Sequence, residues 1–174
     1  AVHGKGLICM PMSAAMGEKL GLSPMVTKNT DNHETAFTES IDHVETTTGI
    51  SAVERSVTAL KCMEDSIRPE DLRRPGHMFP LIAKPGGVME RNGHTEATVD
   101  LVKLAGLKES GLCCEIMRED GTMMRTTELM GLAEKFGLKM ITIKALQDYR
   151  KKHEVFVSRE AETPMPTKYG EFRA

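Results

Sequence analysis

The sequence predicts an α/β or α+β fold built on a mixed β-sheet. Short apolar runs with strand character alternate along the chain with segments in which apolar residues recur at helical spacing. Hydrophobic residues make up 40% of the 174 residues and charged residues 28%, which is typical of a globular chain. A chain of this length is expected to form one domain with a sizeable core.

The first third of the chain predicts helices and strands with recognisable ends. In order, we expect a strand over residues 6–10, a helix over 13–20, a weaker strand over 37–41 and a helix over 51–63. Ser13 is a favourable N-cap for the first helix, and Gly21 lies just past its end. Ser51 and Glu54 match a capping box, in which each side chain bonds the backbone of the other residue.

Prolines and glycines interrupt the middle of the chain. They are concentrated in residues 69–87, at Pro69, Pro75, Gly76, Pro80, Pro85, Gly86 and Gly87. We expect an irregular stretch there, with residues 79–83 as its only strand. Such a stretch is either a surface loop or a structured functional site.

The second half of the chain alternates between helix and strand again. The expected elements are a helix over residues 95–104, a strand over 112–117, a tight turn over 119–121, a helix over 126–137, a strand over 139–143 and a helix over 144–153. The first of these helices is expected to bury the face that carries Val99, Leu101, Val102 and Ala105. Residues 154–174 lose this periodicity, and we expect them to be a linker or tail.

Composition argues against several classes of function. The net charge of −2 gives no basic excess to attract a nucleic acid, and no apolar run is long enough to span a bilayer. No signal peptide opens the sequence, so we expect a cytoplasmic protein. The cysteines form no C-x-x-C pair, which argues against a structural zinc site and favours four reduced thiols: Cys9, Cys62, Cys113 and Cys114.

A group of polar residues opens the helix expected at residue 95. It comprises Arg91, Asn92, Gly93, His94 and Thr95. Backbone N–H groups at a helix N-terminus favour an anion, a guanidinium can fork onto a phosphate, and a threonine can donate its hydroxyl. An ordinary capped helix with an exposed histidine explains the same pattern.

Two further residues have the chemistry of proton transfer. His77 lies between Pro75 and Pro80, which can hold its side chain in a fixed direction, as a general acid or base requires. Glu115 lies inside an otherwise apolar strand, where a carboxylate that faces the core needs a partner. A turn with a solvated histidine and a strand with one wet face are the plain alternatives. We assign no role to the histidines in polar surroundings: His3, His33, His43 and His153.

Several longer stretches form an ordered set of motifs. They are Thr47-Thr48-Gly49-Ile50-Ser51-Ala52, Arg74-Pro75-Gly76-His77-x-Phe79-Pro80-Leu81, Gly86-Gly87-Val88, Arg91-x-Gly93-His94-Thr95-Glu96-Ala97, Asp100-Leu101, Leu104-Ala105-Gly106, Cys114-Glu115 and Asp120-Gly121-Thr122-Met123. This set resembles the motifs of the 3,4-dihydroxy-2-butanone 4-phosphate synthases. The resemblance covers about residues 3 to 153, in order and at the family's spacings.

The resemblance implies a three-layer α/β fold and a homodimer. It also implies a lyase of riboflavin biosynthesis, which converts ribulose 5-phosphate to 3,4-dihydroxy-2-butanone 4-phosphate and formate through an enediol, with Mg²⁺ or Mn²⁺. By this resemblance His94 binds the metal, and residues 91–95 bind the sugar phosphate. His77 and Glu115 act in catalysis, Glu115 also contacts the substrate, and Thr48 lies close to the site and contributes to substrate binding.

The sequence also departs from the family's pattern. The family begins with an acidic loop that supplies a metal-binding glutamate, and this chain starts downstream of it. We therefore expect residues 1–153 to be an N-terminally truncated synthase domain, and a non-catalytic domain that binds a sugar phosphate or dimerises is the alternative. Residues 166–174 resemble the junction with a GTP cyclohydrolase II domain in bifunctional relatives. That domain's zinc-binding cysteines are absent from this sequence, so no cyclohydrolase activity is expected.

Overall fold

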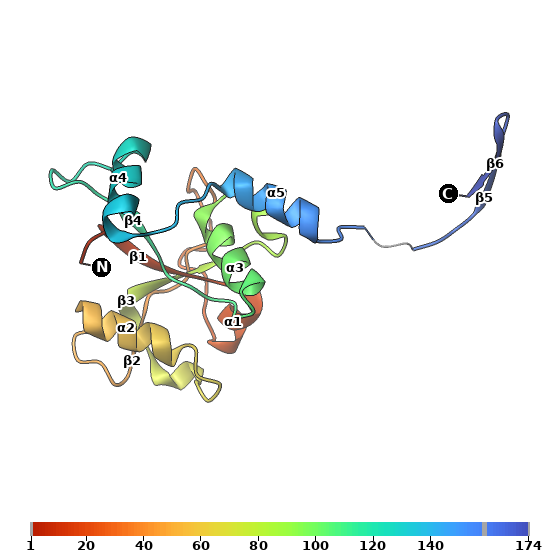
Figure 1. Ribbon diagram of the computed structural model, residues 1–174. Helices are drawn as coiled ribbons and strands as arrows, with labels where there is room; N and C mark the ends of the chain where they lie inside the picture. The colour runs from red at the N-terminus through yellow and green to blue at the C-terminus, as the bar shows by residue number, and fades with distance from the viewer. Residues whose placement is uncertain (1, 158–159, 174) are drawn as a thin grey trace.

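The computed structural model describes residues 2–157 and 160–173 and has a mixed α/β fold (Figure 1). Its centre is a four-stranded sheet in the order β2-β3-β1-β4. The strands are β1 (Lys5–Met12), β2 (Ile41–His43), β3 (Leu72–Ile82) and β4 (Cys113–Ile116). β1 and β3 run parallel, while β2 and β4 pair antiparallel at the two edges. The predicted mixed sheet is therefore confirmed.

Helices connect and cover these strands. The α-helices are α1 (Ala14–Lys19), α2 (Ala52–Lys61), α3 (His94–Leu104), α4 (Thr126–Phe136) and α5 (Ile143–His153), and the short 3-10 helices are η1 (Pro69–Asp71) and η2 (Gly87–Met89). Ser13 caps α1 by accepting from the N–H of Met16 at 3.3 Å, and Ser51 caps α2 in the same way. Gly21 follows α1 with a φ of 63°, so the predicted ends of this helix are confirmed.

The sheet separates two layers of helices, and this gives the three-layer arrangement. On β1, the side chains of Ile8, Met10 and Met12 point into the main core, where α1 and α2 pack. The alternate residues Leu7 and Cys9 face the other side, along which α3 lies. Met10 and Met12 are at most 2% exposed, and burying such a side chain contributes about 1.5–3 kcal/mol. One face of the sheet is therefore filled by the core, and the other is available for a site.

β3 differs most from the sequence prediction. It is a strand of 11 residues, whereas residues 69–87 were expected to be irregular apart from residues 79–83. Proline has no N–H to donate, but the carbonyl of Pro80 accepts from the backbone N–H and the hydroxyl of Thr38, both at 3.1 Å. A proline is tolerated in such a strand where its neighbour needs only an acceptor.

Three other predictions were wrong. β2 begins at Ile41, and the residues before it form only isolated bridges instead of the strand expected over residues 37–41. Residues 139–142 are not in a strand of the described structure, because they lead directly into α5, which Thr142 caps. α3 buries Val99 as predicted, but it leaves Leu101 44% exposed and otherwise buries polar side chains: Thr95, Glu96 and Asp100.

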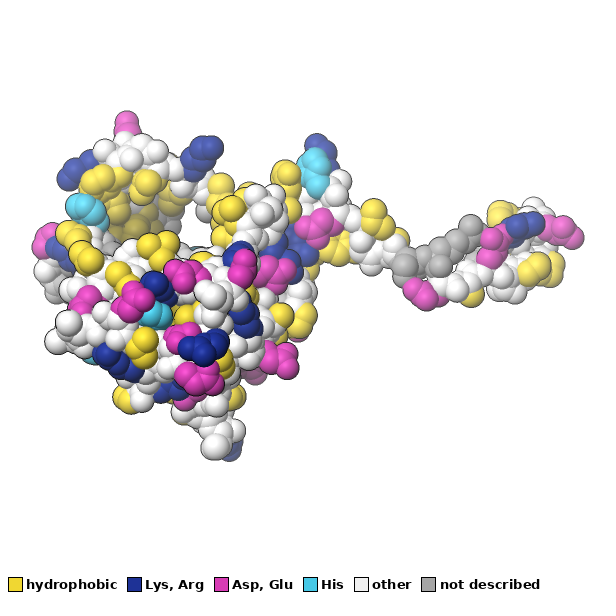
Figure 2. Space-filling view, turned by 90° about the horizontal axis from the view of Figure 1, so that it is seen from below, with side chains coloured by type: hydrophobic (Ala, Val, Ile, Leu, Met, Phe, Trp, Pro, Cys, Tyr) yellow, Lys and Arg dark blue, Asp and Glu magenta, His cyan; other side chains and the backbone are white. Residues whose placement is uncertain are grey.

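The C-terminal residues contain a hairpin where a linker or tail was expected. β5 (Pro164–Thr167) pairs antiparallel with β6 (Gly170–Arg173), and the hairpin lies apart from the sheet in Figure 1. Figure 2 shows acidic and basic side chains intermingled over one face of the molecule, as expected from its net charge of −2. Within the described residues, every helix is too short or too polar to cross a membrane.

Candidate active site

A cavity of about 630 Å³ opens on the face of the sheet opposite the main core. Its floor comes from β1 and β4, and its walls come from residues 31–37 and from residues 91–95 at the start of α3. The topology brings the floor and the α3 wall together, because β4 pairs with β1 and α3 packs against both strands. The fold thus brings the predicted residues Arg91, Asn92, Gly93, His94 and Thr95 together with Glu115.

The first turn of α3 faces the cavity without a side-chain cap. Gly93 is the N-cap residue and has no side chain to accept the N–H groups of this turn. These N–H groups lack partners within the helix and carry partial positive charge. His94 and Thr95 both line the cavity, and Thr95 is only 5% exposed. The geometry therefore suits a phosphate or a similar anion, which is what the sequence predicted here.

Arg91 lies just before this turn and forms an ion pair with a buried carboxylate. Its Nη1 donates to Oε2 of Glu96 at 2.6 Å, and the Glu96 side chain is 1% exposed. The pair passes directly over Gly93, where a Cβ atom would lie 2.2 Å from Nη1 of Arg91 and 2.6 Å from Oε2 of Glu96. Glycine at position 93 thus leaves room for this ion pair and gives a ligand access to the backbone.

The loop of residues 29–35 forms the opposite wall and is organised around Asp31. The Asp31 carboxylate accepts from the backbone N–H groups of Thr35 at 2.9 Å and His33 at 3.1 Å. These bonds, led by the one from Thr35, lower the pKa of Asp31 below its usual value. The loop therefore presents a stable negative charge to the cavity, together with the side chains of His33 and Thr35.

Glu115 and two thiols form the floor. Glu115 is exposed on β4, and Gly6 lets β1 approach it closely, since a Cβ at Gly6 would lie 2.1 Å from the Glu115 carbonyl oxygen. Cys9 and Cys113 are directly opposite each other across β1 and β4. A hydrogen bond between the thiols raises the pKa of Cys9 and lowers that of Cys113. Neither thiol is in a disulfide. Among the carboxylates on the sheet strands, Glu115 is the one that lines the cavity.

His77 is not among the residues that line the cavity. Its Nδ1 lies 2.7 Å from Oδ2 of Asp42, and its backbone N–H donates to Oδ1 of the same carboxylate at 3.0 Å. Asp42 is buried, while the His77 side chain is 42% exposed, so the ring is oriented from behind and its other nitrogen is accessible. Side chains alternate along β3, so His77 faces the same side of the sheet as Leu81, which lines the cavity about 13 Å farther along.

Thr48 lies near His77 and does not line the cavity. Its hydroxyl donates to Oε2 of Glu54 at 3.3 Å, and the next residue, Gly49, packs directly on the carboxylate of Asp42. The Glu54 carboxylate also accepts from the hydroxyl and N–H of Thr47, which lowers its pKa to about 2. In the capping box, Glu54 therefore bonds the preceding loop instead of the expected N–H of Ser51.

The described residues do not by themselves form a metal site. Across residues 2–157 and 160–173, no three His, Cys, Asp or Glu side chains gather closely enough to hold an ion. Glu96 and Asp100, the carboxylates near His94 in sequence, are buried and bonded to Arg91 and Arg150 respectively. Mg²⁺ prefers several oxygen ligands, so His94 would need further ligands from water, substrate or other residues.

Sequence reasoning missed two features of this region. Asp31, His33 and Thr35 line the cavity although they were given no role, and Asp42 orients His77. The only sign of this cavity wall in the sequence was the dense run of polar turn residues at 28–35. Asp42 gave no comparable indication, because its pairing with His77 depends on the antiparallel contact between β2 and β3.

Comparison with known proteins identifies the family. The family model for 3,4-dihydroxy-2-butanone 4-phosphate synthase matches residues 1–149. The chain therefore belongs to the 3,4-dihydroxy-2-butanone 4-phosphate synthase family, as its motifs predicted.

The curated relatives that the chain matches are longer proteins. The chain is 54% identical over 172 residues to riboflavin biosynthesis protein RibBA of Bacillus cytotoxicus, covering 99% of this chain and 43% of that protein. The RibBA protein of Bacillus cereus is 55% identical with the same coverage. The chain thus spans less than half the length of the curated relatives it matches.

Solved structures confirm the fold. RibBX, a two-domain 3,4-dihydroxy-2-butanone 4-phosphate synthase from A. baumannii, is 42% identical with a TM-score of 0.87, over 98% of this chain and 51% of that chain. A 3,4-dihydroxy-2-butanone 4-phosphate synthase in complex with two magnesium ions is 38% identical with a TM-score of 0.83, over 87% of this chain and 76% of that one.

Proposed function

We propose that this chain is a 3,4-dihydroxy-2-butanone 4-phosphate synthase, a lyase of riboflavin biosynthesis that acts on ribulose 5-phosphate. The observation that carries the proposal is the cavity itself. It places the uncapped start of α3 opposite the Asp31 loop and above Glu115, within a chain that belongs to this family. These three features supply an anion site, fixed negative charge and a carboxylate that can exchange a proton.

The phosphate of the substrate is assigned to the start of α3. The backbone N–H groups after Gly93 favour an anion, and Thr95 adds a hydroxyl within the cavity wall. The volume of about 630 Å³ accommodates a five-carbon sugar phosphate together with water. With the phosphate on α3, the sugar extends across the floor toward Glu115.

Glu115 is proposed as the group that moves a proton within the cavity. In the proposed reaction a base removes the proton at C3 of ribulose 5-phosphate to give an enediol. Water is then lost from C1, the carbon skeleton rearranges, and the carbonyl carbon derived from C4 takes up water and leaves as formate. A carboxylate exposed beside the sugar is placed to take or return a proton in these steps.

His77 is proposed as a second proton-transfer group, oriented by Asp42. The buried Asp42 carboxylate fixes the ring through Nδ1, an arrangement that suits a general acid or base. His77 lies some distance along β3 from the cavity that holds Glu115. His77 and Glu115 can therefore act on one substrate only if the sugar or the protein bridges that distance. Thr48 lies near His77, so we propose that it contacts the substrate only if the substrate also reaches His77.

A divalent metal, Mg²⁺ or Mn²⁺, is proposed as the cofactor, with His94 as one ligand. Support comes from the related synthase solved with two magnesium ions and from the position of His94 in the cavity wall. Because no complete cluster of metal ligands is present in the described part of the chain, we assign no reaction step to the metal. A cytoplasmic location and a homodimer are proposed on the family resemblance alone.

The domain division is proposed in the same way. Residues 1–153 hold the sheet, the helices and the cavity, and residues 154–174 with the β5-β6 hairpin are assigned to the connection toward further sequence. The RibBA relatives, which are more than twice as long as the matched region, support a place for this domain within a longer enzyme.

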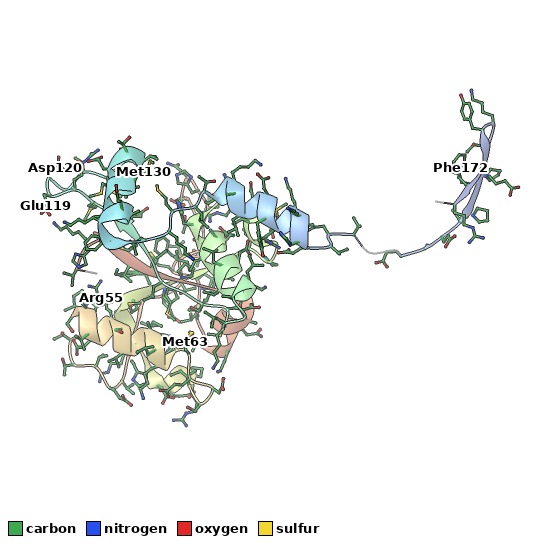
Figure 3. The ribbon with its side chains drawn as sticks, in the orientation of Figure 1. Arg55, Met63, Glu119, Asp120, Met130 and Phe172 are labelled. Carbon is green, nitrogen blue, oxygen red and sulfur yellow. The ribbon has the colours of Figure 1, made fainter. Side chains whose placement is uncertain are left out.

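Formate release from ribulose 5-phosphate in the presence of Mg²⁺ tests the proposal. The protein in its natural full length should release formate, and Glu115→Gln in that protein should reduce kcat by at least about 100-fold, the usual scale for a proton-transfer group. Glu119→Gln is the matched control, since Glu119 lies at the tip of the turn after β4 and away from the cavity (Figure 3). Binding of ribulose 5-phosphate without formate release would instead support the non-catalytic sugar-phosphate-binding alternative.

A further inference from the structure

Cys9 and Cys113 lie opposite each other on the floor of the cavity. They are partners in the antiparallel pairing of β1 with β4, so their side chains leave the sheet on the same face. Both residues line the cavity, where Cys9 is 9% exposed and Cys113 is half-buried. A small molecule that enters the cavity therefore reaches both sulfur atoms.

The backbone holds these two residues at the separation that a disulfide requires. Residues directly opposite each other on antiparallel strands have Cα atoms about 4.5–5.5 Å apart, and disulfides join Cα atoms about 4.4–6.8 Å apart. A hydrogen bond already links the two thiols. An S–S bond between them therefore needs only a small adjustment of β4 toward β1.

The other two cysteines are placed differently. Cys114 is next to Cys113 in β4, but its side chain packs against the main core on the opposite face of the sheet, and Cys62 lies within that core. Burial raises the pKa of Cys62 to about 12, whereas the hydrogen bond from Cys9 lowers the pKa of Cys113. Cys113 therefore has the two features of a reactive thiol, a stabilised thiolate and access from a cavity.

We propose that Cys9 and Cys113 are a dithiol that a peroxide oxidises reversibly to a disulfide, and that this disulfide lowers turnover by displacing Glu115. Glu115 follows Cys113 by two residues and lies on the same face of β4. Misplacement of a reacting group by about 1 Å can reduce a rate by about 100-fold. The inference rests on the proposed function only for the effect on turnover.

The reaction consumes one peroxide for each disulfide. The Cys113 sulfur attacks a peroxide oxygen, the O–O bond breaks, and the sulfur is oxidised by two electrons to a sulfenic acid. With hydrogen peroxide, the other oxygen takes up the thiol proton and leaves as water. The Cys9 sulfur then attacks the sulfenic sulfur, the S–O bond breaks, and the departing hydroxide takes the Cys9 proton to form a second water. A dithiol such as dithiothreitol reverses the oxidation and is itself oxidised to a cyclic disulfide.

Peptide mapping of the protein in its natural full length is the first test. Trypsin releases Cys9 in the peptide of residues 6–19 and Cys113 in the peptide of residues 109–118. After treatment with hydrogen peroxide and alkylation of the remaining thiols, mass spectrometry without reduction should show these two peptides joined. Dithiothreitol should separate them. Fragmentation of the joined peptides should place the bond at Cys113.

Two matched variants assign the bond independently, because the second peptide also contains Cys114. Cys113→Ala should yield no joined peptides after oxidation. Cys114→Ala removes the neighbouring thiol on the opposite face and should yield them as wild type does. Far-UV circular dichroism confirms that each variant is folded. A wild-type protein whose cavity thiols stay reduced, or are oxidised only to sulfinic or sulfonic acid, would overturn the proposal, as would a bond located at Cys114.

Formate release from ribulose 5-phosphate is the second test, with each protein compared with its own reduced form. Hydrogen peroxide should lower kcat of wild type and of Cys114→Ala by roughly tenfold or more, and dithiothreitol should restore it. Cys113→Ala should lose much less activity at the same dose, because the thiol that reacts with the peroxide is gone. Joined peptides with unchanged turnover, or an equal reversible loss in Cys113→Ala, would overturn the effect on turnover. If the reduced wild-type protein releases no formate, the proposed function fails, whereas the peptide map still decides whether the disulfide forms.

Discussion

The buried pair between Asp100 and Arg150 provides a direct test of how the site is held in place. Oδ2 of Asp100 accepts from Nη1 of Arg150 at 2.8 Å and from the N–H of Val88 at 2.9 Å. Arg150 also donates to the carbonyl oxygen of Gly86 at 3.0 Å. The pair joins α3, α5 and the turn at η2, and it thereby fixes the segment that leads into residues 91–95.

Arg150→Met should destabilise the protein by about 3–4 kcal/mol. Removing one partner of a buried pair typically costs about 3–5 kcal/mol, because the other charge stays buried. Asp100 keeps its bond from Val88, which lowers this cost, and the methionine retains the packing of the stem. The loss of the bond to Gly86 adds about 1 kcal/mol, while the more exposed pair with Glu154 contributes less than about 1 kcal/mol.

A second substitution identifies the cause. With Asp100→Asn in the same chain, no buried charge is left, so the double variant should be about 1–2 kcal/mol more stable than Arg150→Met alone. Urea unfolding followed by far-UV circular dichroism measures these values at an unchanged m-value. Lys144→Met, which removes an exposed helical pair with Asp148, is the control and should change stability by less than about 0.5 kcal/mol. A cost below about 1 kcal/mol for Arg150→Met, or simple additivity in the double variant, would refute the reasoning.

Three further predictions concern the groups around the site. The pKa of Glu54 is lowered to about 2 by its bonds from Thr47, so the stability it contributes should be present above about pH 4.5 and lost as the pH falls toward 2. Acid unfolding of Glu54→Gln should therefore converge with wild type over that window, and a constant difference would contradict it. Burial raises the pKa of Cys62 to about 12, so iodoacetamide at pH 8 should label the partly exposed Cys114 at least about 100-fold faster, as peptide mass mapping would measure. Gly49→Ala, whose Cβ would lie 2.0 Å from Oδ2 of Asp42 at a φ of 83°, should lower Tm by about 4–8 °C in calorimetry, and an unchanged Tm would show that this contact is not tight.

The parts of the fold that follow local rules could be predicted from the sequence. Ser13, Gly21 and Gly137 mark helix ends because a capping hydroxyl and a left-handed backbone act within a few residues. The apolar runs of β1 and β4 were likewise recognisable. Only the C-terminal part of β3 was predicted, as a strand over residues 79–83. The rest was missed because prolines usually interrupt a strand, and whether a proline fits depends on which neighbouring residue needs an N–H donor.

The same limit applies to the site. The residues of α3 that line the cavity were predicted, since a polar helix start is a local pattern. The partners that define their roles come from distant segments: the Arg91 guanidinium bonds the carbonyl of His33, 58 residues away, and Asp42 orients His77 from 35 residues away. Sequence pattern alone left Arg91 open between a phosphate ligand and a residue of an ordinary capped helix, because it gave no indication of these long-range bonds.

A crystal structure of the protein with bound ribulose 5-phosphate tests the central claim most directly. The phosphate should lie at the N–H groups of the first turn of α3, next to Thr95, and the sugar should extend across the floor to Glu115 and face Asp31. A sugar phosphate bound elsewhere on the molecule, with α3 and Glu115 left untouched, would contradict the assignment of this cavity as the active site.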